Sequence, residues 1–293
     1  MTFNIVHTTA YEYSAPAIES FTELRVRPRQ SNRQIVHNHV TEVTPRAALE
    51  EFTDYYENTV ECLSVPYRHK CLTVTSRSTV ETLPHKDALS GLDLTVSEAV
   101  RLNWPHRREL FDFLMPSMHS PITPEVEEIS KQQLPSSASF AGSILGLCSY
   151  IYNTFTYMPG VTDIRTPLSE VLRKRQGVCQ DFAHLMIALI RSAGLPARYV
   201  SGYLETESVR GVSGLVGATA SHAWVEVYLP SGLWVGIDPT NDMLEGERHV
   251  QIGIGRDYGD VPPLRGVFKG AKRQQLSVMV TVSRTTGEMV AGA

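Results

Sequence analysis

The stretch RQGVCQDFAHLMIALIRSAG, residues 175–194, has the pattern of a buried helix with a cysteine near its start and Gly194 as a stop signal. Polar side chains form only a thin stripe, made of Gln180, His184 and Arg191. The apolar residues that cover most of the circumference are Phe182, Ala183, Met186, Ile187, Leu189, Ile190 and Ala193. Because apolar residues on nearly all sides indicate burial, we predict a central helix that the surrounding structure packs against.

Cys179 lies in the first turn of this predicted helix, where unpaired backbone N–H groups and the positive end of the helix dipole converge. That field favours a thiolate, the nucleophilic form of cysteine. The same N–H groups can stabilise an oxyanion that forms on an attacked carbonyl. Gly177 allows a substrate to approach closely. A structural role is the alternative, because buried cysteines are common in folded proteins.

A catalytic thiol needs a base, and the base needs a group that orients it. His184 lies about 140° around the helix from Cys179, so it faces elsewhere. His222 is the better candidate, because it begins SHAWVEVYL, a segment with the period-two alternation of a strand.

The segment PSG joins this strand to LWVGID and predicts a tight hairpin. A three-residue loop pairs Leu229 with Leu233 and sets Trp224 opposite Asp238, so that His222 is diagonal to Asp238 on the same face. A register tighter by two residues sets His222 directly opposite Asp238. Either register brings an imidazole near a carboxylate, whereas a one-residue slip separates them. The structural alternative is a surface histidine and an aspartate before a turn.

The chain changes character along its length. Its first hundred residues contain short, β-branched, partly alternating segments, which predict an antiparallel sheet or sandwich. Helical periodicity begins after residue 120, and a glycine-rich loop is expected at 210–217. We predict an α+β protein with a β-rich domain at 1–110, a core at 111–245, and an extension at 246–293 that returns a strand to a sheet.

Two segments together resemble the transglutaminase-like superfamily: GVCQDFAHLMIALIRSAGLPARYVSGYL and ASHAWVEVYLPSGLWVGIDPTN. The resemblance implies a papain-like core in which Cys179 is the nucleophile, His222 the general base and acid, and Asp238 the residue that orients it. HTTAYEYSAPAIESFTELRVRPR with TDYYENTV resembles the β-rich N-terminal domain of a bacterial subgroup, and HVQIGIGRDYGDVPPLRGVFKG resembles its C-terminal extension. Glu57 stands where that subgroup usually has glycine, which concerns the geometry of one turn.

Three further residues are weaker candidates for substrate binding or for the oxyanion site. Tyr157 matches an aromatic residue that the family places before the nucleophile, and core packing is its alternative role. Gln180 follows the nucleophile in the first helical turn. Trp224 shares a strand face with His222, although a tryptophan in a strand is usually part of the core.

Composition excludes several classes of protein. The net charge of −4 argues against a nucleic-acid or anionic-membrane partner, and no apolar run has the length of a membrane span. The N-terminal residues lack the pattern of a secretion signal, so we expect a cytoplasmic location. Cys62, Cys71 and Cys148 are expected to be small buried hydrophobes. No cofactor, metal site or calcium activation is expected.

These inferences predict a thiol-dependent amide hydrolase, a peptidase or amidase, that acts on a peptide or isopeptide through an acyl-enzyme. Transglutaminase-type transfer of the acyl group to an amine is one alternative. A non-catalytic peptide-binding module on the same fold is another, although such a module has no need to keep all of Cys179, His222 and Asp238.

Overall fold

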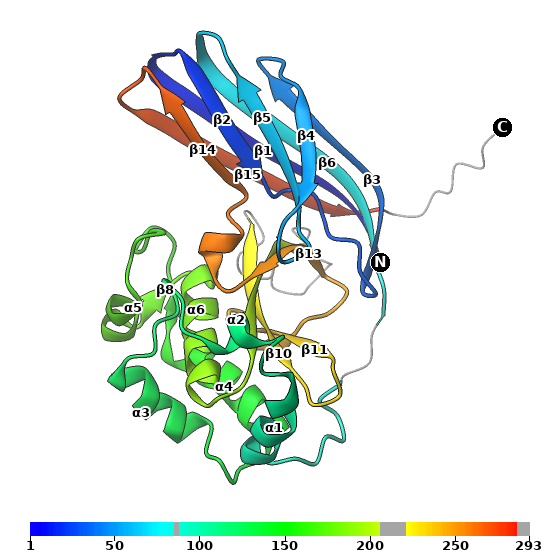
Figure 1. The fold of residues 1–293 in the computed structure, drawn as a ribbon, viewed down its shortest axis with the longest axis vertical. Helices are drawn as coiled ribbons and strands as arrows, with labels where there is room; N and C mark the ends of the chain where they lie inside the picture. Colours follow the sequence, from blue (N-terminus) through cyan, green and yellow to red (C-terminus); the bar gives the residue numbers. More distant parts are fainter. Residues whose placement is uncertain (85–87, 206–220, 286–293) are drawn as a thin grey trace, which may run out of the picture.

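A computed structural model describes residues 1–84, 88–205 and 221–285, and the glycine-rich loop expected at 210–217 lies outside these ranges. The described elements form a β-sandwich stacked on a mixed layer of helices and sheet (Figure 1). The predicted α+β class is therefore confirmed, with strands β1 to β6 making the β-rich N-terminal region. Within the described residues, no helix combines the length and apolarity that crossing a membrane requires.

The sandwich consists of two antiparallel sheets with the strand orders β15-β1-β6-β3 and β14-β2-β5-β4. Its N-terminal strands are β1 (Thr2–Ala17), β2 (Glu19–Leu24), β3 (Gln34–Thr44), β4 (Leu49–Thr53), β5 (Thr59–Val65) and β6 (His69–Thr82). Alternating side chains of these strands point inward, as period two requires. They form the sandwich core of Tyr13, Ala17, Leu24, Val26, Leu63, Val65, Leu72 and Val74.

The C-terminal segment contributes to both layers. Its elements are β13 (His249–Gly255), the short helix η2 (Tyr258–Asp260), β14 (Leu264–Lys269) and β15 (Gln274–Arg284). Strand β13 pairs with β9 (Ala197–Leu204) in the lower sheet, whereas β14 pairs with β2 and β15 pairs with β1. The chain thus returns from the core to the sandwich where it began.

The lower layer has an antiparallel sheet of order β12-β11-β10-β9-β13 with helices on one face (Figure 1). Its remaining strands are β10 (His222–Tyr228), β11 (Trp234–Asp238) and β12 (Met243–Leu244). The helical elements are α1 (Val96–Asn103), η1 (Trp104–His106), α2 (Phe111–Leu114), α3 (Pro124–Gln133), α4 (Phe140–Thr154), α5 (Leu168–Lys174) and α6 (Cys179–Ser192). Strands β7 (Thr156–Tyr157) and β8 (Gln176–Gly177) form a short parallel pair. Domain boundaries at 110 and 245 remain predictions.

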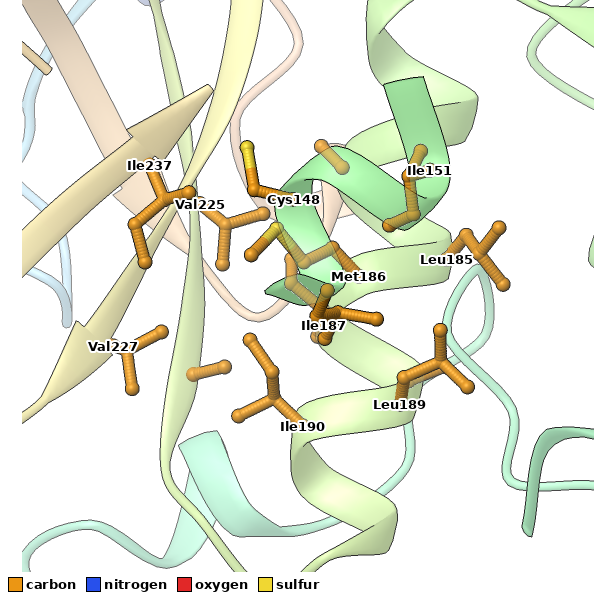
Figure 2. Close-up of a cluster of buried hydrophobic side chains, with 14 of the residues drawn as sticks. Cys148, Ile151, Leu185, Met186, Ile187, Leu189, Ile190, Val225, Val227 and Ile237 are labelled. Atoms are coloured by element: carbon orange, nitrogen blue, oxygen red, sulfur yellow. The ribbon is translucent and has the colours of Figure 1, made fainter. Parts of the chain in front are cut away.

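Helix α6 is the predicted central helix, and apolar side chains surround it. Met186, Ile187 and Ile190 belong to one buried cluster with Cys148 and Ile151 of α4 and with the strand residues Val225, Val227 and Ile237 (Figure 2). Burying one such side chain stabilises the fold by about 1.5–3 kcal/mol. This packing holds the start of α6 in a fixed place against the sheet.

On a surface helix a polar stripe faces solvent, but the polar side chains His184 and Arg191 of α6 do not. His184 and Arg191 are both buried. Arg191 donates hydrogen bonds to the backbone carbonyls of Met115, Ala197 and Arg256, which lie in three different segments. A guanidinium has donors on several sides, so this one side chain holds three segments of the chain at the end of the helix.

Side-chain amides cover the outer edge of β13. The Gln34 side chain pairs with both the N–H and the C=O of Gln251, at 2.8 Å each. Asn58 does the same for Ile254, also at 2.8 Å. An edge strand leaves backbone groups unpaired, and these two amides from the sandwich satisfy them.

Glu57 precedes Asn58, whose side chain bonds to the Ile254 backbone, and has a positive φ of 62°. The left-handed conformation costs a residue with a side chain about 1–2 kcal/mol, a cost that glycine avoids. The departure noted in the sequence is therefore a site of backbone strain.

We expect Glu57→Gly to raise the free energy of unfolding by about 0.5–1 kcal/mol, since glycine relieves the strain but adds entropy to the unfolded chain. Urea unfolding followed by circular dichroism measures the change. Glu51→Gly, in the regular strand β4, is the matched control and should destabilise. A Glu57→Gly protein less stable than the parent would contradict this account.

Candidate functional site

Cys179 is the first residue of α6 and is 8% exposed. The Asp181 carboxylate accepts hydrogen bonds from the Val178 N–H at 2.8 Å and from the Thr162 hydroxyl at 2.6 Å. A Cβ atom on Gly177 would lie 2.9 Å from that carboxylate, so the close approach requires glycine. These contacts hold the backbone on both sides of Cys179.

The hairpin of β10 and β11 has the register of the three-residue loop. Val225 pairs with Ile237 and Tyr228 with Trp234, and the Leu229 N–H donates to the Leu233 carbonyl. In this register His222 is diagonal to Asp238. Its Nε2 lies 2.8 Å from the Asp238 Oδ2, and both side chains are fully buried.

The protonation of His222 follows from its neighbours. Burial alone would lower the pKa of this imidazole, but the charges of Asp238 and Cys179 outweigh burial and raise the pKa to about 10. His222 is therefore an imidazolium at neutral pH. Since Nε2 is engaged by Asp238, Nδ1 is the ring nitrogen left for Cys179.

Asp238 is held by four donors. Its Oδ1 accepts from the Thr240 N–H at 2.9 Å. Its Oδ2 accepts from His222, from the Asn241 Nδ2 at 2.7 Å, and from the His249 Nε2 at 3.3 Å. Burial raises the pKa of a carboxyl group, but here the charge of His222 and these donors hold the pKa well below its usual range. Asp238 is therefore ionised.

Tyr157 and Gln180, two of the weaker candidates from the sequence, lie near the start of α6. Tyr157 packs on Phe182 with ring centroids 6.3 Å apart, and it pairs with Gly177 through β7 and β8. Burial and the charges of Cys179 and Asp238 raise its pKa to about 12. Gln180 is half-buried in the first turn of α6.

Trp224 is fully buried and lies under the imidazole of His222. The two rings stack with centroids 6.1 Å apart, and Trp224 also meets the His249 ring edge-on at 5.1 Å. A Cβ atom on Gly202 would come within 2.3 Å of the indole, so the adjacent strand has glycine where the indole needs space.

Two residues of the site were missed in the sequence, Asn241 and His249. Asn241 belongs to the quoted segment IDPTN, and a side-chain amide just after a proline turn is a weak signal for contact with the preceding aspartate. His249 begins β13, which pairs with β9 and not with β11. Its contact with Asp238 therefore depends on the order of the strands in the sheet, which cannot be predicted from the residues around His249 alone.

His222, Asp238 and His249 also form a possible metal-ligand set, because one donor atom from each lies within 4.8 Å of the others. Two imidazoles and a carboxylate suit Zn²⁺. However, all three atoms already take part in hydrogen bonds to one another.

The other cysteines differ from expectation in part. Cys148 is buried, but Cys62 is half-buried and Cys71 is exposed. The prediction of burial for Cys71 was wrong, because Cys71 lies on the outward face of β6, in phase with Thr73 and out of phase with the buried Leu72. All four cysteines are free thiols.

Comparison with known proteins gives the family of the chain. Residues 128–239 match the family model of the transglutaminase-like superfamily, and residues 3–81 match that of the bacterial transglutaminase-like N-terminal region. An uncharacterized protein of Mycobacterium leprae is 34% identical over 289 residues, which cover 96% of this chain and 98% of that protein.

Two further matches differ in extent. The crystal structure of a candidate cysteine protease from Cytophaga hutchinsonii has a TM-score of 0.74 at 23% identity and covers 97% of this chain and 91% of that one. A protein-glutamine gamma-glutamyltransferase of Pseudomonas aeruginosa is 42% identical over 99 residues, 31% of this chain and 15% of that protein. On its family models and full-length relatives, the chain belongs to the transglutaminase-like superfamily, with the papain-like fold of that group.

Proposed function

We propose that this protein is a thiol-dependent amide hydrolase, a peptidase or amidase, that acts through Cys179, His222 and Asp238. The observation that carries the proposal is the buried pair of His222 and Asp238 beside the start of α6. An imidazolium next to a cysteine in a first helical turn is the environment that makes a thiolate.

In the first half of the reaction, the Cys179 sulfur attacks the carbonyl carbon of the amide and forms a C–S bond. His222 transfers its proton to the leaving nitrogen, so that the C–N bond breaks and an amine departs. The products of this half are a thioester on Cys179 and a neutral imidazole that Asp238 still orients.

In the second half, water attacks the thioester while His222 takes a proton from it. The C–S bond breaks, the acid leaves, and the sulfur and the imidazolium return to their first state. Peptide or isopeptide substrates suit this chemistry, and it needs no cofactor.

Negative charge develops on the carbonyl oxygen in both halves. Backbone N–H groups in the first turn of α6, with Gln180, are the nearest donors that the helix can offer. The Tyr157 hydroxyl is a further donor, because its raised pKa keeps the proton on at neutral pH. Trp224 supports the imidazole from below.

Transfer of the acyl group to an amine is the second candidate. The matching segment of the Pseudomonas aeruginosa gamma-glutamyltransferase favours it. The first half is the same, and an amine replaces water as the group that breaks the C–S bond. A peptide-binding module without turnover is the third reading, and the ionised, fully buried pair speaks against it.

We also propose a reducing compartment, the cytoplasm, for the protein. All four cysteines are free, and Cys71 is exposed, where an oxidising environment would modify it.

Cys179 should react with iodoacetamide at pH 6 much faster than Cys71, although Cys71 is the more exposed thiol. The reason is that only Cys179 has an imidazolium partner. Peptide mapping by mass spectrometry measures both rates in one sample. In His222→Ala the two cysteines should react with iodoacetamide at similar rates. If Cys179 of the parent protein reacts no faster than Cys71, the catalytic proposal is wrong.

A library of peptides and isopeptides, incubated with and without an added amine, should separate hydrolysis from transfer. We expect cleaved acids without the amine, and a dominant acid product with it. Mass spectrometry of the products gives the ratio, and Cys179→Ala should abolish both. Equal turnover by the parent and Cys179→Ala would end the proposal, whereas mainly amide products would favour the second candidate.

The reaction should slow as the pH rises through about 10, because His222 loses the proton that the leaving amine needs. The pKa is raised from 6.5, so the proton is held at every lower pH. Asp238→Asn removes the charge that raises the His222 pKa most. The pH at which the rate begins to fall should therefore drop by about one to three units. The ¹⁵N shifts of the His222 ring measure its pKa directly. An unchanged pKa in Asp238→Asn would contradict the assigned cause.

A further inference from the structure

His249 is a buried histidine beside the proposed catalytic group, and the mechanism above gives it no task. It begins β13 opposite Leu204 of β9 and is 3% exposed. Its ring packs edge-on against Trp224, which in turn stacks on His222. One indole thus supports both imidazoles, whose own ring centroids are 6.3 Å apart.

The hydrogen bonds of His249 determine where its proton lies. The Gly246 N–H points at Nδ1 at 3.2 Å, so Nδ1 is the acceptor. A ring nitrogen that accepts carries no proton, and in a neutral imidazole the proton is then on Nε2. Nε2 lies 3.3 Å from the Asp238 Oδ2 and donates to it.

The proton position on His249 also argues against a metal ion bound by His222, Asp238 and His249. A metal at the His249 Nε2 requires the proton on Nδ1, with a partner that accepts it. Here Nδ1 faces a backbone N–H, which cannot accept. The Asp238 Oδ2 also receives the Asn241 amide in addition to both imidazoles.

We propose that His249 is a positioning residue, which acts through Asp238 and holds its Oδ2 in line with the His222 Nε2. This inference rests on the proposed function, because it concerns the same reaction. The Oδ2 of Asp238 has donors on two sides, Asn241 and His249, in addition to His222. With His249 absent, the carboxylate can tilt toward Asn241, and the hydrogen bond to His222 lengthens.

The charged and titratable groups around this unit come from several elements. Cys179 faces His222 from α6, and Asp238 faces it from β11. Burial and the charge of Glu226 raise the pKa of Glu245, the buried carboxyl group that follows β12. Tyr157 interacts with both Cys179 and Asp238. Asp238 and Glu245 are carboxyl groups that accept hydrogen bonds, so neither takes the place of the His249 Nε2–H.

The test compares His249→Phe with His249→Gln. Phenylalanine keeps the ring against Trp224 but has no donor, whereas the glutamine Nε2 restores an N–H at the corresponding distance along the side chain. Titration of the His222 ring by ¹⁵N shifts should give a pKa about one unit or more lower in His249→Phe. In His249→Gln it should return toward the parent value of about 10.

His7→Phe is the matched control, because His7 is also buried and its two ring nitrogens bond to Thr9 of β1 and Tyr203 of β9. It should leave the His222 titration unchanged. If the His222 pKa in His249→Phe equals that of the parent protein, the proposal is overturned. A merely structural role for His249 would lower stability without moving the His222 pKa.

Two measurements on the parent protein keep the proposal falsifiable if His249→Phe does not fold. The ring ¹⁵N shifts should show the His249 proton on Nε2, and a proton on Nδ1 would overturn it. Stoichiometric binding of added zinc chloride, with a change in the His249 signals, would do the same. If Cys179 proves unreactive while His249→Phe still lowers the His222 pKa, the proposed function fails and the positioning role stands.

Discussion

The hydrogen bond between His222 and Asp238 is the interaction on which this site depends. Two fully buried charges are costly to remove from water, and their attraction repays that cost only when the remaining polar atoms are satisfied. Thr240, Asn241 and His249 supply those partners to the carboxylate. The pair is therefore stable as an ion pair because the protein surrounds the anion with donors, and an ionised Asp238 in turn keeps His222 protonated beside Cys179.

That arrangement constrains the sheet around it. Trp224 fills the space beneath His222, which requires glycine at position 202. On the same strand, Glu226 is buried and bonds to Arg198 and Gln251. Buried polar groups need complete partners, so this face of the sheet combines bonded polar groups with the apolar cluster of Trp224, whereas α6 packs on the other face through apolar side chains (Figure 2).

The sequence predicts the parts of this design that depend on local pattern. The helix with Cys179, the in-phase pairing of the hairpin and the α+β class follow from periods and turn signals over a few residues, although the choice between the two in-phase registers does not. The burial of His184 and Arg191 does not, because their partners lie in distant loops. Neither does the role of His249, since sheet order brings β13 to the site. The prediction for Cys71 was wrong for a different reason: it relied on the usual burial of cysteine, whereas the alternation of β6 puts Cys71 on the outward face.

The position of β13 links the site to the sandwich. Its first residue, His249, bonds to Asp238, while its outer edge is covered by Gln34 and Asn58 from the N-terminal strands and turns. Arg33 adds a contact with the buried Glu245, just before β13. A strand whose edge is satisfied by side chains cannot shift without breaking those bonds. The N-terminal layer therefore fixes the strand that carries His249, and through Asp238 it contributes to the geometry of a histidine that it does not touch.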